Sequence, residues 1–175
     1  LFGVVEGAGA LFLSPEGTRT VSATSRTYTA SASGAFGMSL GAVDLFASSS
    51  ARFPLSFAGA LPGAGYRTNV AGIDVAGRGA EVSLRAAAES GWAGRPDVTF
   101  QAAPGGTTQV NGLASLLGVE PWRAGALDYA PSRGEVVPFV ASIDETTNDP
   151  TSWRPDLPAS VARAIPALVH ADGKN

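Results

Sequence analysis

The sequence predicts an all-β protein in which antiparallel strands form a sandwich, with one short helix. Two observations carry this prediction: apolar and polar residues alternate over several short segments, and turn residues separate these segments. Charged residues make up only 15% of the chain, whereas it contains 22 Gly and 12 Pro. This composition favours many short strands joined by turns over long charged helices.

The clearest alternation lies in residues 80–86, where apolar and polar side chains change places at every step, as in a strand with one face on the core. Residues 136–143 also alternate, but Val136 and Val140 make the second face apolar too. We therefore expect a central strand or an interface there. Further strands, bounded by Gly or Pro, are expected at residues 9–14, 18–29, 34–40, 66–75, 97–102, 107–110 and 125–130.

Two local features qualify this pattern. In residues 66–75 the apolar phase slips between Val70 and Ile73, and Gly72 between them predicts a β-bulge. The helix is expected at residues 112–117, with Asn111 as its N-cap and Gly118 as its C-terminal stop.

Self-similarity along the chain predicts a repeat of modules. In one series, residues 1–4, 9–11 and 14–15 match residues 116–119, 125–127 and 130–131. In another, residues 44–45, 51–52 and 60–62 match residues 156–157, 162–163 and 164–166. We expect residues 1–44 to be the C-terminal part of a preceding β module, 45–156 a complete module, and 157–175 the start of a following module or a linker. That size fits an immunoglobulin-like sandwich of about 100 residues. Chance recurrence of short Gly, Ala and Pro peptides is the alternative.

Residues 65–70, residues 104–111, and residues 140–144 with 148–150 together resemble an uncharacterised tandem module of secreted multidomain bacterial proteins. The resemblance implies that Tyr66, Arg67, Thr68 and Asn69 open a strand and that the closing strand ends in an Asp-containing turn. Residues 25–28 and 34–37 resemble the closing segment of a preceding copy. The resemblance implies a secreted, extracellular or cell-surface location and no particular activity.

Charge and composition argue against several partners. A net charge of −3 and a pI near 5.1 predict no nucleic-acid binding. No apolar run reaches the roughly 18 residues of a spanning helix, so no membrane span is expected. Without Cys the fold has neither a disulfide nor a thiolate metal site. The first residues lack the basic flank of a signal peptide, and the chain begins without Met, which suggests a processed or excised segment.

Candidate catalytic groups are few. His170 is the single His, and no Gly-x-Ser-x-Gly motif accompanies it, so a structural or solvent-exposed role is favoured. The turn between Asp128 and Glu135 could bring two carboxylates to adjacent strands, at a separation useful for glycoside hydrolysis. Solvated ends of a hairpin explain the same two residues more simply.

Candidate binding groups also have structural alternatives. Residues 144–149 offer oxygen ligands for Ca²⁺ but lack the spacing of an EF-hand loop, and turn formation explains them as well. Trp92, Trp122 and Trp153 would bind sugars only if they shared one face, and packing is the commoner role. Residues 7–9 and 63–65 read as turns and not as a dinucleotide fingerprint.

The sequence therefore predicts no catalytic, cofactor-binding or metal-binding residue and no cofactor. The expected function is a noncatalytic extracellular structural or adhesive sandwich module, with polymerisation by strand complementation as one mode. A carbohydrate-binding module of a secreted enzyme is the alternative. The expected partners are neighbouring modules, other copies of the chain, or a surface polysaccharide, and the chain itself is not expected to be an enzyme.

Overall fold

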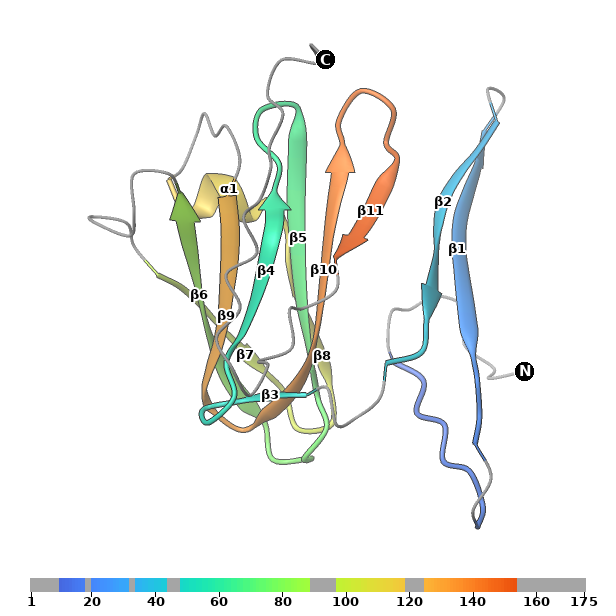
Figure 1. Cartoon of the computed structure of the whole chain (residues 1–175), viewed down its shortest axis with the longest axis vertical. Helices are drawn as coiled ribbons and strands as arrows, with labels where there is room; N and C mark the ends of the chain where they lie inside the picture. The colour runs from blue at the N-terminus through green and yellow to red at the C-terminus, as the bar shows by residue number, and fades with distance from the viewer. Residues whose placement is uncertain are drawn as a thin grey trace.

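The computed structural model of the chain describes residues 10–17, 20–31, 34–43, 48–88, 97–118 and 125–153. These residues form a two-layer antiparallel sandwich and a separate two-stranded hairpin (Figure 1). The elements are β1 (Thr24–Ser31), β2 (Gly34–Gly41), β3 (Ser49–Ser50), β4 (Leu55–Leu61), β5 (Tyr66–Asp74), β6 (Ala80–Ala88), β7 (Val98–Ala102), β8 (Thr107–Val110), α1 (Leu113–Leu116), β9 (Gly125–Arg133), β10 (Glu135–Asp144) and β11 (Pro150–Trp153). The predicted all-β sandwich with one short helix is confirmed.

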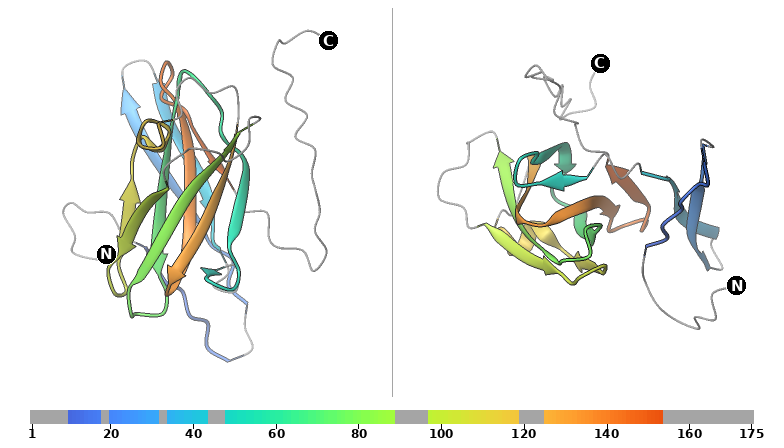
Figure 2. Two further views of the ribbon diagram at one scale, coloured as in Figure 1. Left: turned by 90° about the vertical axis from the view of Figure 1, so that its left-hand side faces the viewer. Right: turned by 90° about the horizontal axis from the view of Figure 1, so that it is seen from below.

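The sandwich consists of two sheets that face each other (Figures 1 and 2). The first has the strand order β11-β10-β5-β8, and β3 pairs with the start of β10 on the edge that β11 also uses. The second has the order β4-β9-β6-β7. Since β4 and β5 lie in different sheets, as do β9 and β10, the chain passes repeatedly between the layers.

Strand β10 is the central strand that its two apolar faces predicted. It pairs with β5 along its whole length and with β11 and β3 on its other edge. Both Val136 and Val137 are buried, as are Val140 and Ala141. Burial of successive residues, which point to opposite faces, confirms that neither face of β10 is fully open to solvent.

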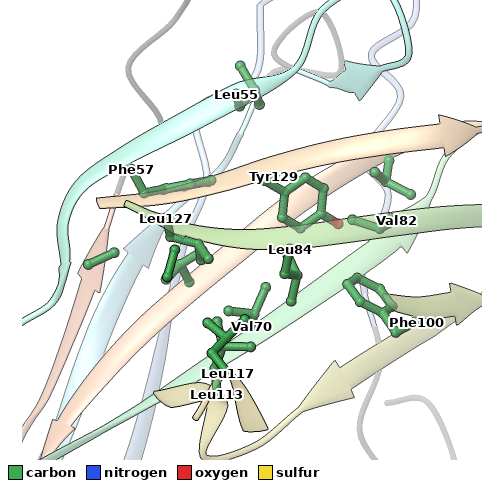
Figure 3. Packing of buried hydrophobic residues seen from close by; sticks show 14 of the residues in the cluster. Leu55, Phe57, Val70, Val82, Leu84, Phe100, Leu113, Leu117, Leu127 and Tyr129 are labelled. Atoms are coloured by element: carbon green, nitrogen blue, oxygen red, sulfur yellow. The ribbon is translucent and has the colours of Figure 1, made fainter. Parts of the chain in front are cut away.

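The core lies between the two sheets, with Tyr129 of β9 near its centre (Figure 3). The ring of Tyr129 makes edge contacts with Phe57 and Phe100, at centroid distances of 6.3 and 6.1 Å. Leu113 and Leu117 cap this core from the helical segment and are fully buried. The remaining large buried side chains come from both sheets: Leu61, Leu84, Leu127, Val70, Val82, Val136 and Val140.

A single residue, Gly134, carries the chain from β9 in one sheet to β10 in the other. Its φ is +82°, and an added Cβ would lie 2.6 Å from both the Ala80 Cβ and the Gly79 carbonyl oxygen. Only glycine fits a position with both a left-handed backbone and no space for a side chain.

The predicted β-bulge at Gly72 is wrong. Strand β5 pairs with β10 and with β8 without any register shift, and Gly72 lies inside both ladders. A Cβ at Gly72 would lie 2.5 Å from the Tyr129 hydroxyl and 3.0 Å from the Phe100 ring. The glycine therefore makes room for two core aromatics. Register shifts occur instead in β4, between Phe57 and Leu61, and in β9, where Ser132 is the extra residue opposite Glu81 and Val82.

The short helix is confirmed, but its predicted N-cap is wrong. Gly112, and not Asn111, occupies the N-cap position, with φ of 62° and no side-chain cap. The Gly112 N–H instead donates to Oδ1 of Asn69 on β5. Gly118 follows the helix with a positive φ, as expected for its C-terminal stop.

Of the strand predicted at 9–14, the described residues 10–14 form none, and the strand predicted at 18–29 begins only at Thr24. Residues 10–14 find no partner strand among the described residues, and alternation without a partner does not make a strand. Strands β3, β4 and β11 were not predicted. They are short, or carry Gly and Pro that weaken the alternation.

The hairpin β1–β2 stands outside the sandwich, with β2 beside the edge strand β11 (Figures 1 and 2). The sandwich strands all fall between Ser49 and Trp153. The division at residues 44 and 156, and the repeat behind it, stay predictions.

Candidate functional site

The aromatic and His candidates are only partly within the described residues. His170, Trp92 and Trp122 lie outside them. Trp153 is half-buried on β11, where its Nε1 donates to the Ser142 hydroxyl at 2.8 Å. Its ring also packs against the core, so the structure uses Trp153 to hold the sandwich together.

The prediction that the turn between Asp128 and Glu135 places two carboxylates on adjacent strands is wrong. Asp128 lies on β9 and Glu135 on β10, and these strands belong to opposite sheets because the chain crosses over at Gly134. Asp128 accepts a hydrogen bond from the Ser56 hydroxyl at 2.7 Å, and Glu135 accepts one from Ser48. Each acid is thus engaged with a separate serine, and the pair does not form a hydrolytic dyad.

The acidic segment 144–149 forms the turn between β10 and β11. Oδ1 of Asp144 accepts the backbone N–H groups of Thr146 and Thr147, at 2.7 and 3.0 Å. The Asp149 N–H donates to the Thr147 hydroxyl. Across the residues described, no group of three His, Cys, Asp or Glu side chains is placed to hold a metal ion. The turn interpretation explains this segment, and the calcium alternative is not tested by these contacts.

Asp74 is the most constrained carboxylate of the described chain, with only 1% of its surface exposed. Its oxygens accept backbone N–H groups from Gly105 at 2.8 Å, Gly79 at 3.0 Å and Ala76 at 3.3 Å. Burial acts to raise the pKa of Asp74, but these donors and the Arg78 backbone outweigh it and hold the pKa below its ordinary value. The carboxylate thus links the β5–β6 turn to the β7–β8 turn. Both of its oxygens are engaged by these backbone hydrogen bonds.

A second buried polar cluster joins the two sheets at the irregular end of β4. The carbonyl oxygen of Ala60 accepts both the Thr68 hydroxyl at 2.8 Å and the Ser142 hydroxyl at 2.9 Å. The two hydroxyls lie 3.2 Å apart, and Trp153 donates to Ser142. The register shift of β4 frees the Ala60 carbonyl from its ladder, and the opposite sheet satisfies it. The cluster is structural.

The outer face of the second sheet carries an ion pair. Arg85 on β6 donates from Nε and Nη2 to the two carboxylate oxygens of Asp97, at 2.9 and 2.8 Å. The hydrogen bonds from Arg85 lower the pKa of Asp97, although partial burial acts against them and Ser83 adds a further donor. The Arg85 side chain remains 54% exposed, so this face is a solvated polar surface.

The N-terminal unit, which we define as the described residues within 10–43, contrasts with these satisfied clusters. Six of its large apolar side chains are 50% to 67% exposed: Leu11, Phe12, Leu13, Val21, Tyr28 and Val43. Its two strands pair with each other and with no other described strand. Among the described residues, this unit therefore combines exposed apolar surface with strand edges that no described strand pairs, as interaction surfaces of other proteins do.

The sequence contained signals for some of these features. Thr68 and Ser142 each follow or precede by two residues an apolar residue that is buried, Val70 and Val140 respectively, so the period of two placed them on the inward face. Asp74 precedes the turn residues Gly77 and Gly79, which is the setting of a carboxylate that accepts backbone N–H groups. The exposure of Leu11 to Leu13 had no local signal, because the same residues would suit a core strand.

No protein-family model, curated protein or solved structure matches the chain significantly. Among the described helices, none is long and apolar enough to span a membrane.

Proposed function

We propose that the chain is a noncatalytic structural or adhesive module with an immunoglobulin-like sandwich, and that it joins other protein chains through its N-terminal unit. The observation that carries the proposal is the concentration of exposed apolar residues in that unit. The described sandwich buries most of its large apolar side chains, with Phe53, Tyr66 and Leu116 as exposed exceptions, and it engages Asp74, Asp128, Glu135 and Trp153 in structural contacts. A location outside the cell and a tandem arrangement belong to the same proposal, supported by the resemblance of residues 65–70 and 104–111 to secreted bacterial modules.

Association of the full chain tests this proposal. Light scattering coupled to size-exclusion chromatography, over a wide range of protein concentration, should show a mass that rises above that of the 17.6 kDa monomer. Replacing Leu11, Phe12 and Leu13 by Ser should reduce this association, because it removes apolar surface that a partner would bury.

The matched control replaces Phe53 and Tyr66 by Ser, since these are exposed apolar residues of the sandwich itself. It should leave the association unchanged. An equal loss of association in both variants would mean that non-specific hydrophobic contact, and not the N-terminal unit, drives association. Binding to a panel of soluble polysaccharides by a chain that stays monomeric would instead favour a carbohydrate-binding module.

A further inference from the structure

One edge of strand β1 has no partner strand among the described residues, and we call it the free edge. Strand β1 pairs with β2 over eight residues in an unbroken antiparallel register, and no described residue pairs with its other edge. Two-stranded hairpins are marginally stable alone, whereas three or more strands hold together. Strand β1 contains no Pro, and Arg26 is its single charged residue. An exposed edge strand of this length and composition can pair with another strand.

The backbone groups at this edge follow from the hydrogen bonds of the hairpin. The N–H of Ala42 donates to the carbonyl oxygen of Ala23 at 2.9 Å, one step beyond the first pair of the ladder. Hydrogen-bonded pairs alternate with non-hydrogen-bonded pairs in an antiparallel ladder, so Ser25, Thr27 and Thr29 bond inward to β2. The residues that direct N–H and C=O to the free edge are therefore Thr24, Arg26, Tyr28 and Ala30.

We propose that the free edge of β1 pairs with β1 of a second copy of this chain, antiparallel, about a two-fold axis at Thr27. The inference rests on the proposed function and names its partner and register. Arg26 then lies opposite Tyr28 of the second copy, and Thr24 opposite Ala30. The result is a continuous four-stranded sheet in the order β2-β1-β1-β2.

Two observations select this register among those that match the hydrogen-bonding groups. An axis at Arg26 would set the two Arg26 side chains directly opposite each other, which is destabilising. An axis at Tyr28 would leave Thr24 without a partner, whereas an axis at Thr27 pairs all four outward residues. It also places Arg26 beside an aromatic ring, and the Arg26 guanidinium already lies 5.6 Å from the Tyr28 ring centroid within the strand.

An isologous contact of this kind closes at the dimer, because both copies use the same edge. The dimer joins two N-terminal units through the shared sheet, and the sandwich of each copy lies outside that sheet. The proposed module would thus be displayed in pairs.

Because the chain contains no Cys, an introduced Cys can form a disulfide only with another introduced Cys. At the axis the two Thr27 residues form a non-hydrogen-bonded pair, whose Cα atoms are about 4.5 Å apart, within the range that a disulfide spans. The full-length Thr27→Cys variant should therefore form a covalent dimer under mild oxidation, seen as a doubled mass on a non-reducing gel.

Ser25→Cys is the matched control. The two Ser25 residues lie on opposite sides of the axis, four positions apart along the strand and roughly 13 Å from each other. This variant should form no covalent dimer under the same oxidation. The double variant Ser25→Cys with Thr29→Cys should cross-link, because these two positions face each other across the axis.

Equal cross-linking of Thr27→Cys and Ser25→Cys would overturn the proposed register. A wild-type chain that dimerises by light scattering while Thr27→Cys fails to cross-link would overturn the proposed edge, yet leave association through the N-terminal unit standing. A chain that is monomeric at every concentration and does not cross-link would overturn both proposals.

Discussion

The sandwich and the N-terminal unit are built from similar residues but end in different environments. In the sandwich, Phe57 is fully buried because the opposite sheet covers it, and Phe100 is nearly so. In the N-terminal unit, Phe12 is 51% exposed and Tyr28 is 63% exposed. One layer of strands cannot bury its own face, so a second layer decides whether an apolar side chain becomes core or surface.

The two regions also differ in how far their polar groups are hydrogen-bonded. Within the sandwich, Asp74 and the Thr68–Ser142 pair are deeply buried, and their partners satisfy them with short hydrogen bonds. The hairpin instead has backbone groups of Arg26 and Tyr28 that no other described strand pairs. These buried polar groups of the sandwich are thus satisfied within it, whereas part of the hairpin backbone has no strand partner among the described residues.

The largest expected difference is in the free energy of unfolding, between one Phe substitution in the sandwich and one in the N-terminal unit. Phe57→Ala should lower the free energy of unfolding by about 3–5 kcal/mol, since it leaves a cavity against Tyr129 in the core. Phe12→Ala should change it by less than about 0.5 kcal/mol. Urea unfolding followed by circular dichroism measures both. Similar losses would show that Phe12 is buried in solution.

Gly72→Ala should destabilise the sandwich by about 3 kcal/mol, because the new methyl group overlaps the Tyr129 hydroxyl and the Phe100 ring. The Tyr129 hydroxyl is buried without a hydrogen-bond partner among the described residues, and burial raises its pKa. Tyr129→Phe should therefore be neutral or stabilising, and should recover part of the loss in the double variant. Additive effects in a thermal or urea unfolding cycle would contradict the close approach.

Asp74→Asn should cost about 2 kcal/mol at neutral pH, because it weakens charge-assisted hydrogen bonds to two turns. The pKa of Asp74 in the folded chain lies below its ordinary value of 3.8. The carboxylate thus stabilises the fold above that pH, and its contribution is lost as the pH falls through the folded pKa.

The free energies of unfolding of wild type and Asp74→Asn, measured from pH 7 to pH 2, should accordingly converge toward acid. Asp149→Asn is the control, since its side chain is exposed in a turn, and it should stay within about 0.5 kcal/mol of wild type. A constant gap between wild type and Asp74→Asn over this range would argue against the lowered pKa.

The smallest effect is expected on the outer face of the second sheet. Arg85→Ala removes a bidentate ion pair with Asp97, but Arg85 is half-exposed and solvent screens the interaction. The unfolding midpoint should remain nearly unchanged, and any difference should vanish in molar salt. A clear loss that persists in salt would show that this face is covered in solution.

Local pattern was enough to predict several strands and not others. Residues 107–110 form β8 as predicted, and the alternation of 80–86 falls within β6. By contrast β4 was missed, since Ala58, Gly59 and Ala60 interrupt its alternation where the strand shifts register. The prediction failed at Gly72 for a related reason, because a glycine in a strand signals either a bulge or a close approach, and only the neighbouring side chains distinguish the two.

The sequence by itself determined the class of fold, the central position of β10, the short helix and the turn at residues 144–149, because each depends on the periodicity or turn chemistry of a few consecutive residues. Only the tertiary structure decided that β9 and β10 enter different sheets, so that Asp128 and Glu135 separate, and that Tyr129 lies over Gly72. It also decided that Phe57 is core while Phe12 is exposed. Burial depends on which distant segment covers a residue, and that long-range partner is not encoded in the local pattern.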